Sequence, residues 1–271
     1  MMPVMSPKYR LTSTSAALFL LFSVARGAVA AEAPLVDLAL WGGIKTTAMR
    51  DLKHETDLVT ADMKAHGMDV VTSGTGGLGT GLEAGWRLPA HLSVCLRGGW
   101  LGRDGGDITG TLSDAYGTAD VYEHVTINGW CVEGGGRYER LVAPRLSLRG
   151  GLFAGLVRAT ADIRLRSKVT GLYALLLGSG DHTVPYRASG LVAEALVGVA
   201  YAITPRCCAG LDAGWRLGKT GPLKATAAGD TDNDGAIDAV AGDPRRSSDG
   251  TKDLTLDFSG LVATLFITLA L

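Results

Sequence analysis

The sequence predicts an all-β protein, an eight-stranded antiparallel transmembrane β-barrel with short periplasmic turns and long extracellular loops. Three observations lead to this prediction. Apolar residues alternate with small or polar residues through eight segments, and short turns alternate with long polar connections between those segments. Aromatic residues gather on the apolar face near both ends of the segments, as expected where a barrel meets the two membrane interfaces.

The N-terminal part of the chain differs in composition from the rest. Lys8 and Arg10 precede an apolar run at 16–24 and then a cleavage site of small residues. This order is typical of a secretory signal peptide. We therefore expect a signal peptide at 1–30 and an outer-membrane barrel domain at 31–271.

The predicted strands fall into hairpins. The alternating runs lie at 35–46, in three hairpins at 77–102, 130–156 and 189–218, and in a final run at 253–271. Each hairpin contains a short turn with a proline, which terminates a strand because it cannot donate a ladder hydrogen bond. Together these runs supply eight strands.

The hairpin at 189–218 shows why strands are favoured over a membrane helix. Its first apolar run ends at Ile203 after about fifteen residues, and a membrane helix needs about twenty. Period two separates its residues cleanly, because Glu194, Asp212 and Arg216 all fall on the face opposite the apolar residues. A soluble lipocalin-like barrel is the rival fold, but it would place its apolar face inward.

The connections alternate in length. Only a few residues join the two strands of each hairpin, around Pro89, Pro144 and Pro205. Long polar segments separate the hairpins, and we expect them to be loops: 48–75, 103–121, 159–188 and 218–253. Short turns on one side and long loops on the other are typical of outer-membrane barrels.

Two aromatic belts are predicted on the apolar face. The belt near the short turns contains Trp86, Tyr138 and Tyr201. The belt near the long loops contains Trp100, Trp130 and Trp215. Amphipathic rings at both heights fit the two headgroup layers of a membrane.

If the apolar face meets lipid, the opposite face lines the lumen of the barrel. That face collects acidic and basic residues in near balance: Asp37, Lys45, Glu83, Arg87, Arg97, Glu133, Arg137, Arg149, Glu194, Asp212 and Arg216. An eight-stranded barrel is just wide enough for its side chains to fill it. We therefore expect a polar plug of paired charges, with a narrow pore for small solutes as the alternative.

The four cysteines match no metal motif. We expect Cys95, Cys131, Cys207 and Cys208 to act as small apolar fillers. A disulfide between Cys95 and Cys131 is the alternative, since an exported protein reaches an oxidising compartment.

With strands, turns and aromatic belts in place, the chain resembles the small outer-membrane β-barrel proteins, a group that includes the OmpA transmembrane domain and the OmpX-like and opacity-type proteins. The terminal run FSGLVATLFITLAL is similar to the family's assembly signal, although Leu271 stands where an aromatic residue is usual. The resemblance implies a bacterial outer-membrane location. It also implies outer-membrane lipid, lipopolysaccharide and the barrel-assembly machinery as partners.

The last long connection contains a possible cation-binding motif. Acidic residues alternate before Gly235, as at the start of an EF-hand calcium loop. The candidate calcium ligands are Asp230, Asp232, Asp234 and Asp238. Ala241 occupies the position of the usual bidentate glutamate, so a solvated acidic loop remains the alternative.

The sequence favours a structural or surface-interaction role over catalysis. Some barrels of the resembled group modify lipid A through Ser and His, which directs attention to His124 with Thr126 or Ser113, and to His182 with Asp181. Neither set forms a recognisable triad in the sequence. A net charge of -1 gives no indication of nucleic-acid binding. The partner of the long loops is not predicted, although Arg103, Arg245 and Arg246 are candidates for contact with lipopolysaccharide phosphates.

Overall fold

A computed structural model describes residues 36–47, 49–72, 77–176, 179–230 and 236–271 of the chain. The predicted signal peptide at 1–30 lies outside the described residues. No α-helix in the described part of the chain is both long and apolar enough to cross a membrane.

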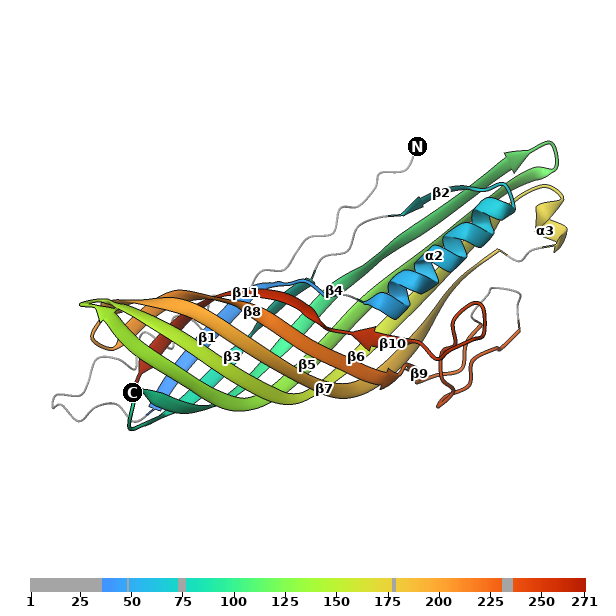
Figure 1. The fold of residues 1–271 in the computed structure, drawn as a ribbon. Helices are drawn as coiled ribbons and strands as arrows, with labels where there is room; N and C mark the ends of the chain where they lie inside the picture. The colour runs from blue at the N-terminus through green and yellow to red at the C-terminus, as the bar shows by residue number, and fades with distance from the viewer. Residues whose placement is uncertain (1–35, 48, 73–76, 177–178, 231–235) are drawn as a thin grey trace. The chain divides into compact units, whose positions relative to one another are not determined.

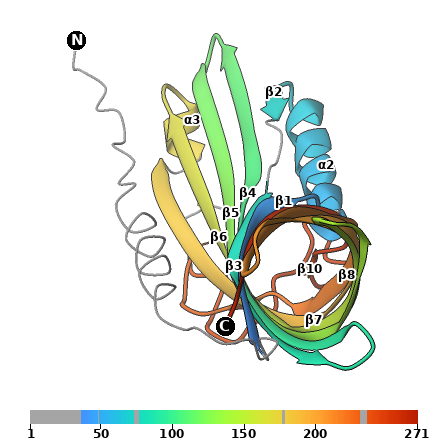
Figure 2. The ribbon, with the colours of Figure 1, turned by 90° about the vertical axis from the view of Figure 1, so that its left-hand side faces the viewer.

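Among the described residues, eight antiparallel strands close into a ring, which confirms the predicted barrel (Figures 1 and 2). The ring strands are β1 (Val36–Lys45), β3 (Gly77–Leu88), β4 (Leu92–Asp114), β5 (Gly117–Ala143), β6 (Leu146–Val169), β7 (Gly180–Thr204), β8 (Cys207–Pro222) and β11 (Gly260–Ala270). The ring closes because β11 pairs with both β8 and β1. Every strand in the ring is therefore paired on both sides, which removes the open edges of a flat sheet.

Shorter elements lie in the long connections between ring strands. They are α2 (Arg50–Ala65), β2 (Asp69–Thr72), α3 (Tyr173–Leu176), β9 (Lys224–Ala225) and β10 (Thr255–Asp257). β2 pairs with β4, β9 with β7, and β10 with β8. We call the end of the barrel with these connections the loop end, and the other the turn end.

The turn end is built from tight hairpins, as the sequence predicts. Leu88 pairs directly with Leu92 across the first turn. Within that turn Ala90 and His91 adopt left-handed backbone conformations, with φ of 63° and 65°. Pro144 and Pro205 lie in the other two turns, where a missing amide hydrogen disrupts no ladder bond.

The prediction of loops at 103–121 and 159–188 is wrong over most of both segments. β4 and β5 continue as a ladder to a turn between Asp114 and Gly117, and β6 and β7 remain paired as far as Ser167 and Gly180. Figure 1 shows these strands running on past the barrel. We call this part of β4–β7 the extended sheet.

The two faces of the extended sheet have the opposite polarity to those of the barrel. In the barrel the outward side chains are apolar and many inward ones are charged. In the extended sheet the inward residues, such as Val125, Ala161 and Val184, are apolar and buried, whereas outward ones such as Arg164 and Arg166 are exposed. The buried residues pack in one cluster with Leu52 of α2 and with the connection between β8 and β11. A strand with water on its outer face needs this arrangement to form a core.

The helix α2 also falls where the sequence analysis expects a loop. Most of the residues of α2 are polar, and Leu52 and Glu55 are the two that are buried. The missed signal is the apolar spacing of Leu52, Val59 and Met63, which places the three on one face of a helix. Such a helix depends on packing against the sheet rather than on its own propensity.

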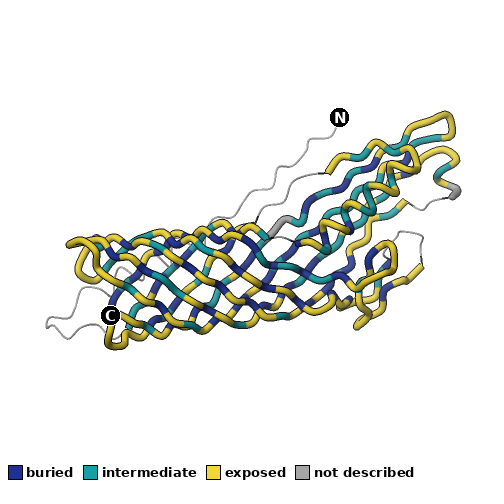
Figure 3. The backbone as a smooth tube through the Cα atoms, in the orientation of Figure 1, coloured by how far each residue is buried: buried dark blue, intermediate teal, exposed yellow. Residues whose placement is uncertain are grey.

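The aromatic belts project outward as predicted. The side chains of Trp86, Tyr138, Tyr201, Trp100, Trp130 and Trp215 are between 44% and 50% exposed. Between the belts the outer surface is formed by exposed Leu, Val and Ala, and the alternation with buried positions is visible along each strand in Figure 3. An apolar band of this kind is stable in lipid rather than in water.

The cysteines are free thiols, so the alternative of a disulfide between Cys95 and Cys131 is not realised. Both of these side chains are buried inside the barrel. Cys207 and Cys208, at the turn end, are partly exposed.

Candidate functional site

The centre of the lumen is crossed by a network of buried ion pairs. Glu194 of β7 binds two nitrogens of Arg216, with Nε at 2.8 Å and Nη2 at 2.7 Å, and Nη2 of Arg97 at 2.7 Å. Glu133 of β5 binds Arg97 and, at 3.1 Å, Arg216. Lys45 lies 3.8 Å from Glu194. These side chains are at most 5% exposed, so water does not screen their interactions.

A second layer of ion pairs lies closer to the turn end. Arg137 binds Glu83, and Nη2 of Arg149 binds Oδ2 of Asp212 at 2.9 Å. Arg149 and Asp212 come from β6 and β8, so this pair spans the strand between them. At the mouth, Arg87 donates two hydrogen bonds to Asp37, of 2.8 and 2.9 Å. The structure therefore places every residue of the predicted lumen set in at least one ion pair.

Aromatic side chains complete the lumen, and the sequence analysis did not assign them there. Lys45 Nζ lies 4.3 Å from the ring centre of Trp41. The guanidinium of Arg97 lies 4.1 Å from the ring centre of Phe153, and that of Arg149 lies 3.6 Å from that of Phe266. These distances are typical of cation–π contacts. The available signal was parity, because Trp41 lies an even number of residues from Asp37 and Lys45 on the same strand.

Glycine on the inner face gives the long cations their space. A Cβ atom added to Gly79 would lie 3.2 Å from Cε of Lys45. At Gly155 an added Cβ would lie 1.9 Å from the carbonyl oxygen of Val132 on β5. The first glycine leaves room for a side chain, and the second allows two strands to approach closely.

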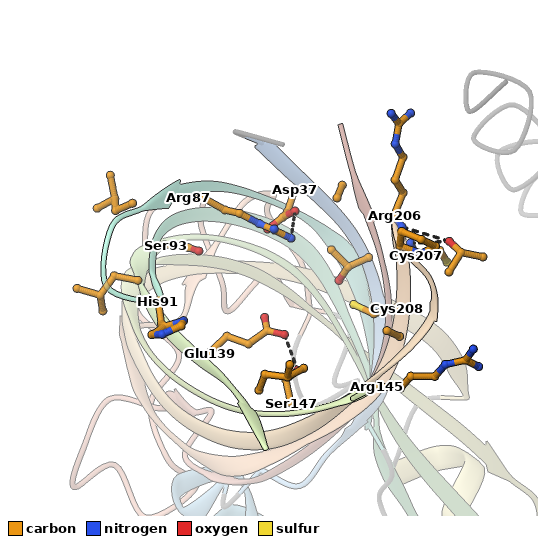
Figure 4. A pocket seen from close by; sticks show the side chains of 18 residues that line it. Asp37, Arg87, His91, Ser93, Glu139, Arg145, Ser147, Arg206, Cys207 and Cys208 are labelled. Atoms are coloured by element: carbon orange, nitrogen blue, oxygen red, sulfur yellow. Dashed lines mark hydrogen bonds and ion pairs between the residues drawn. The ribbon is translucent and has the colours of Figure 1, made fainter. Parts of the chain in front are cut away.

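A polar mouth opens at the turn end, below the ion pairs. It has a volume of about 450 Å³. Figure 4 shows Asp37, Arg87, His91, Ser93, Glu139 and Ser147 around the opening, whereas Arg145 and Arg206 extend away from it. Ser147 donates a 2.5 Å hydrogen bond to Glu139. At the mouth, the carboxylates of Asp37 and Glu139 are therefore both hydrogen-bonded, to Arg87 and Ser147.

On the outer face of the extended sheet, a polar chain joins β4 and β5. Asp107 Oδ1 lies 2.5 Å from His124 Nδ1, and His124 Nε2 lies 2.9 Å from Thr126 Oγ1. The structure therefore brings His124 and Thr126 together, as the sequence analysis considered. It adds the carboxylate of Asp107, which the sequence analysis did not identify. The other candidate set does not form a comparable chain, because Asp181 binds Arg164 through both carboxylate oxygens.

The candidate calcium ligands fall largely outside the described part of the chain. Asp232 and Asp234 lie in the segment 231–235, while Asp230 is buried and Asp238 is exposed. Among the residues that the structure describes, no group of three or more His, Cys, Asp or Glu side chains is arranged to hold a metal ion. Calcium binding remains a prediction from the sequence. The side chain of Arg103 is likewise outside the description.

No protein-family model and no curated protein matches this sequence. Among solved structures, neisserial surface protein A is similar, with 14% identity, a TM-score of 0.35, and coverage of 87% of this chain and 96% of that one. The attachment invasion locus protein Ail of Yersinia pestis has 8% identity and a TM-score of 0.31, with coverage of 86% and 94%. The barrel itself is established by the strand pairing within this chain.

Three properties of the chain combine at this point: a closed antiparallel ring, an outer surface of exposed apolar side chains between two aromatic belts, and ion-paired charges inside the lumen at the level of those belts. A barrel with its apolar face outward requires lipid around it, and among β-sheets only a closed ring satisfies every backbone hydrogen bond there. The protein is a small eight-stranded β-barrel of the outer-membrane type.

Proposed function

We propose that this protein is a surface-interaction barrel of the bacterial outer membrane, with a lumen closed by ion pairs, and not a pore. The observation that carries the proposal is the central network of Lys45, Arg97, Glu133, Glu194 and Arg216. These residues come from five different strands and meet in the middle of the lumen. An ion passing through would have to separate buried pairs that have no water to replace their partners.

The extended sheet supports a role at the cell surface. It continues β4–β7 past the barrel, and it has its own apolar core together with α2 and the connection between β8 and β11. A channel has no need for such an ordered structure beyond the membrane, whereas a binding protein presents its contact residues on a fixed scaffold.

Conductance of the refolded chain in a planar lipid bilayer tests the closed lumen. We expect no ion-conducting steps from the wild type at neutral pH. Steps that are reproducible and that change in size with Glu133→Gln, but not with the outward-facing Arg158→Gln, would overturn the proposal. They would show instead that ions pass the central network.

Epitope tags on intact cells test the orientation. A tag inserted between Asp114 and Gly117, at the tip of the β4–β5 hairpin, should be stained by antibody without permeabilisation. A tag between Leu88 and Leu92 should be stained only after permeabilisation. The reverse pattern would place the extended sheet in the periplasm and refute the surface role.

A lipid-modifying enzyme is the second candidate, and the chain of Asp107, His124 and Thr126 favours it. Its geometry matches a hydroxyl that is activated by an oriented imidazole. Against it, Thr126 lies inside a strand that is paired on both sides, with Asp104 and Asp162. Amides in such a ladder are already bonded and cannot stabilise an oxyanion.

The enzyme candidate is decided by the acylation of the outer-leaflet lipid. Mass spectrometry of lipid A from cells expressing the wild type or Thr126→Val should give identical acyl patterns if the surface-interaction role is right. Loss of an acyl chain that depends on Thr126 would establish the enzyme instead.

A further inference from the structure

A cavity of about 510 Å³ lies between α2, the inner face of the extended sheet and the connection from β8 to β11. Val59 of α2, Glu123 of β5 and Tyr186 of β7 contribute to its walls. The connection contributes the remaining lining residues: Asp238, Ala239, Asp243, Pro244, Arg245, Arg246, Ser247 and Ser248. Its volume is within the range of small-molecule sites, about 300 to 1,000 Å³.

The walls of this cavity are fastened to one another. The buried carboxylate of Glu55 on α2 accepts hydrogen bonds from Ser248, whose backbone nitrogen lies 2.9 and 3.1 Å from the two carboxylate oxygens. The backbone of Arg245 is held on both sides, since its nitrogen donates to Leu223 at 2.7 Å and its oxygen accepts from Leu254 at 2.8 Å. The backbone from which the Arg245 side chain extends is therefore fixed by hydrogen bonds within the connection from β8 to β11.

Two opposite charges meet this cavity without pairing. Glu123 and Arg245 both line it and attract each other electrostatically, yet within the described residues no ion pair of 4.0 Å or less joins them. Nε of Arg245 is buried and has no hydrogen-bond partner in the described part of the chain. Burial raises the pKa of the Glu123 carboxyl, and Glu55 adds to this effect while Arg245 opposes it. The buried Nε of Arg245 therefore keeps hydrogen-bonding capacity that a ligand in the cavity could use.

We propose that this cavity binds a small zwitterion of the amino-acid class, with the carboxylate at Arg245 and the ammonium group at Glu123. The Tyr186 hydroxyl lies beside Arg245 and can donate to the same carboxylate. Val59, Ala239 and Pro244 offer apolar contact to an aliphatic side chain.

The balance of charge around the cavity explains why a zwitterion fits better than a simple ion. Two guanidinium groups and three carboxyl groups line it. A polyanion would be repelled by Asp238 and Asp243, and a simple amine would leave the buried Nε of Arg245 without a partner. A ligand with both charges offers partners to Arg245 and Glu123 at once, and it adds no net charge to a partly buried site. The proposal does not depend on whether the lumen conducts ions.

Leucine is the probe, with its two singly charged analogues as comparisons. Isoamylamine lacks the carboxylate, and 4-methylpentanoate lacks the ammonium group. Calorimetric titration of the mature barrel in detergent micelles at neutral pH should show saturable, one-to-one binding of leucine. Each analogue should bind at least ten-fold more weakly, because it leaves one of the two protein charges without a partner.

Variants separate a specific site from non-specific binding. Arg245→Gln and Glu123→Gln should each weaken leucine binding at least ten-fold, whereas Arg187→Gln, on the outer face of the sheet, should leave it unchanged. Heat-modified migration on gels checks that each variant is folded. The proposal is overturned if leucine shows no saturable binding, if either analogue binds as well as leucine, or if a folded Arg245→Gln binds like the wild type.

Discussion

Glu194 should be among the most important polar side chains for the stability of this barrel. It contacts three cations, Arg216, Arg97 and Lys45, and its side chain is fully enclosed. The central network holds three cations and two carboxylates, so Glu194→Ala leaves three cations with only Glu133. Removing one partner from a buried ion pair typically costs about 3 to 5 kcal/mol. We expect the free energy of unfolding to fall by about this amount.

Urea unfolding in lipid vesicles, followed by tryptophan fluorescence, measures the change. The matched control is Asp181→Ala, which breaks the exposed ion pair with Arg164 and should have little effect on the free energy of unfolding, because solvent screens that pair. If Glu194→Ala is too unstable to refold, Glu194→Gln keeps the size of the side chain and removes only its charge. A loss no larger than that of the control would refute the reasoning that the lumen charges hold the barrel closed.

A double variant distinguishes the electrostatic contribution of Glu194 from its packing contribution. Adding Lys45→Met to Glu194→Gln removes the nearby cation that the carboxylate had balanced at 3.8 Å. If uncompensated charge causes the loss, the double variant should recover part of it, with a coupling free energy of about 0.5 to 3 kcal/mol. Additive losses would assign the effect to packing around Trp41 instead.

Three further predictions concern the outer surface, α2 and the cavity of the extended sheet. Leu152→Arg, on the exposed apolar face of β6, should destabilise the barrel by about 2 to 4 kcal/mol in vesicles. Thr160→Arg, beyond the membrane on the same strand, should have little effect on the free energy of unfolding. Equal effects of the two substitutions would contradict the assigned lipid-facing surface. Glu55→Ala should expose residues 50–65 to proteolysis without changing barrel unfolding, because it removes the hydrogen bonds to Ser248; unchanged digestion would show that α2 is held by its apolar contacts alone. Leucine affinity should rise with pH through the raised pKa of Glu123, because the ammonium group binds the ionised carboxylate, and calorimetry of Glu123→Gln should show no such rise. Around Glu123, the groups that set this dependence are Glu55, Arg245, Tyr186, Asp238, Asp243 and Arg246.

The barrel was predictable from the sequence because period-two alternation reports the environment of each strand directly. On β6, Leu148 and Leu152 lie on one face and Arg149 lies on the other. In lipid the strand is stable only if the leucines face outward and the arginine faces the lumen. The extended sheet was missed because its alternation is harder to see. Its strands also alternate, but on β6 the apolar members are mostly small, such as Ala159 and Ala161, and charged neighbours such as Arg164 and Arg166 dominate the segment. An ordered strand and a polar loop then look alike in composition.

The lumen charges were predictable as a set but not as pairs. Parity places Glu194, Arg97 and Arg216 inside the barrel, whereas their contacts depend on strand tilt and on how far each side chain reaches. Arg149 illustrates the difficulty, since it bypasses the adjacent β7 to reach Asp212 on β8. The cavity at Glu123 and Arg245 had no sequence signal, because Glu123 lies in β5 and Arg245 in the connection from β8 to β11, and the two come together only once the extended sheet has formed.

The inversion of polarity along β6 marks where the membrane ends and explains how one chain supports two separate cores. Outward residues of β6 are apolar or glycine as far as Leu156 and are polar or charged from Arg158 onward. Inward residues change from the charged Arg149 to the apolar Val157 and Ala159. Below the change the barrel is held by lipid around it and by ion pairs within it. Above the change, the extended sheet is held by an apolar core that it shares with α2 and the connection from β8 to β11. Because the two cores depend on different forces, substitutions around the cavity should change leucine binding without changing the unfolding of the barrel.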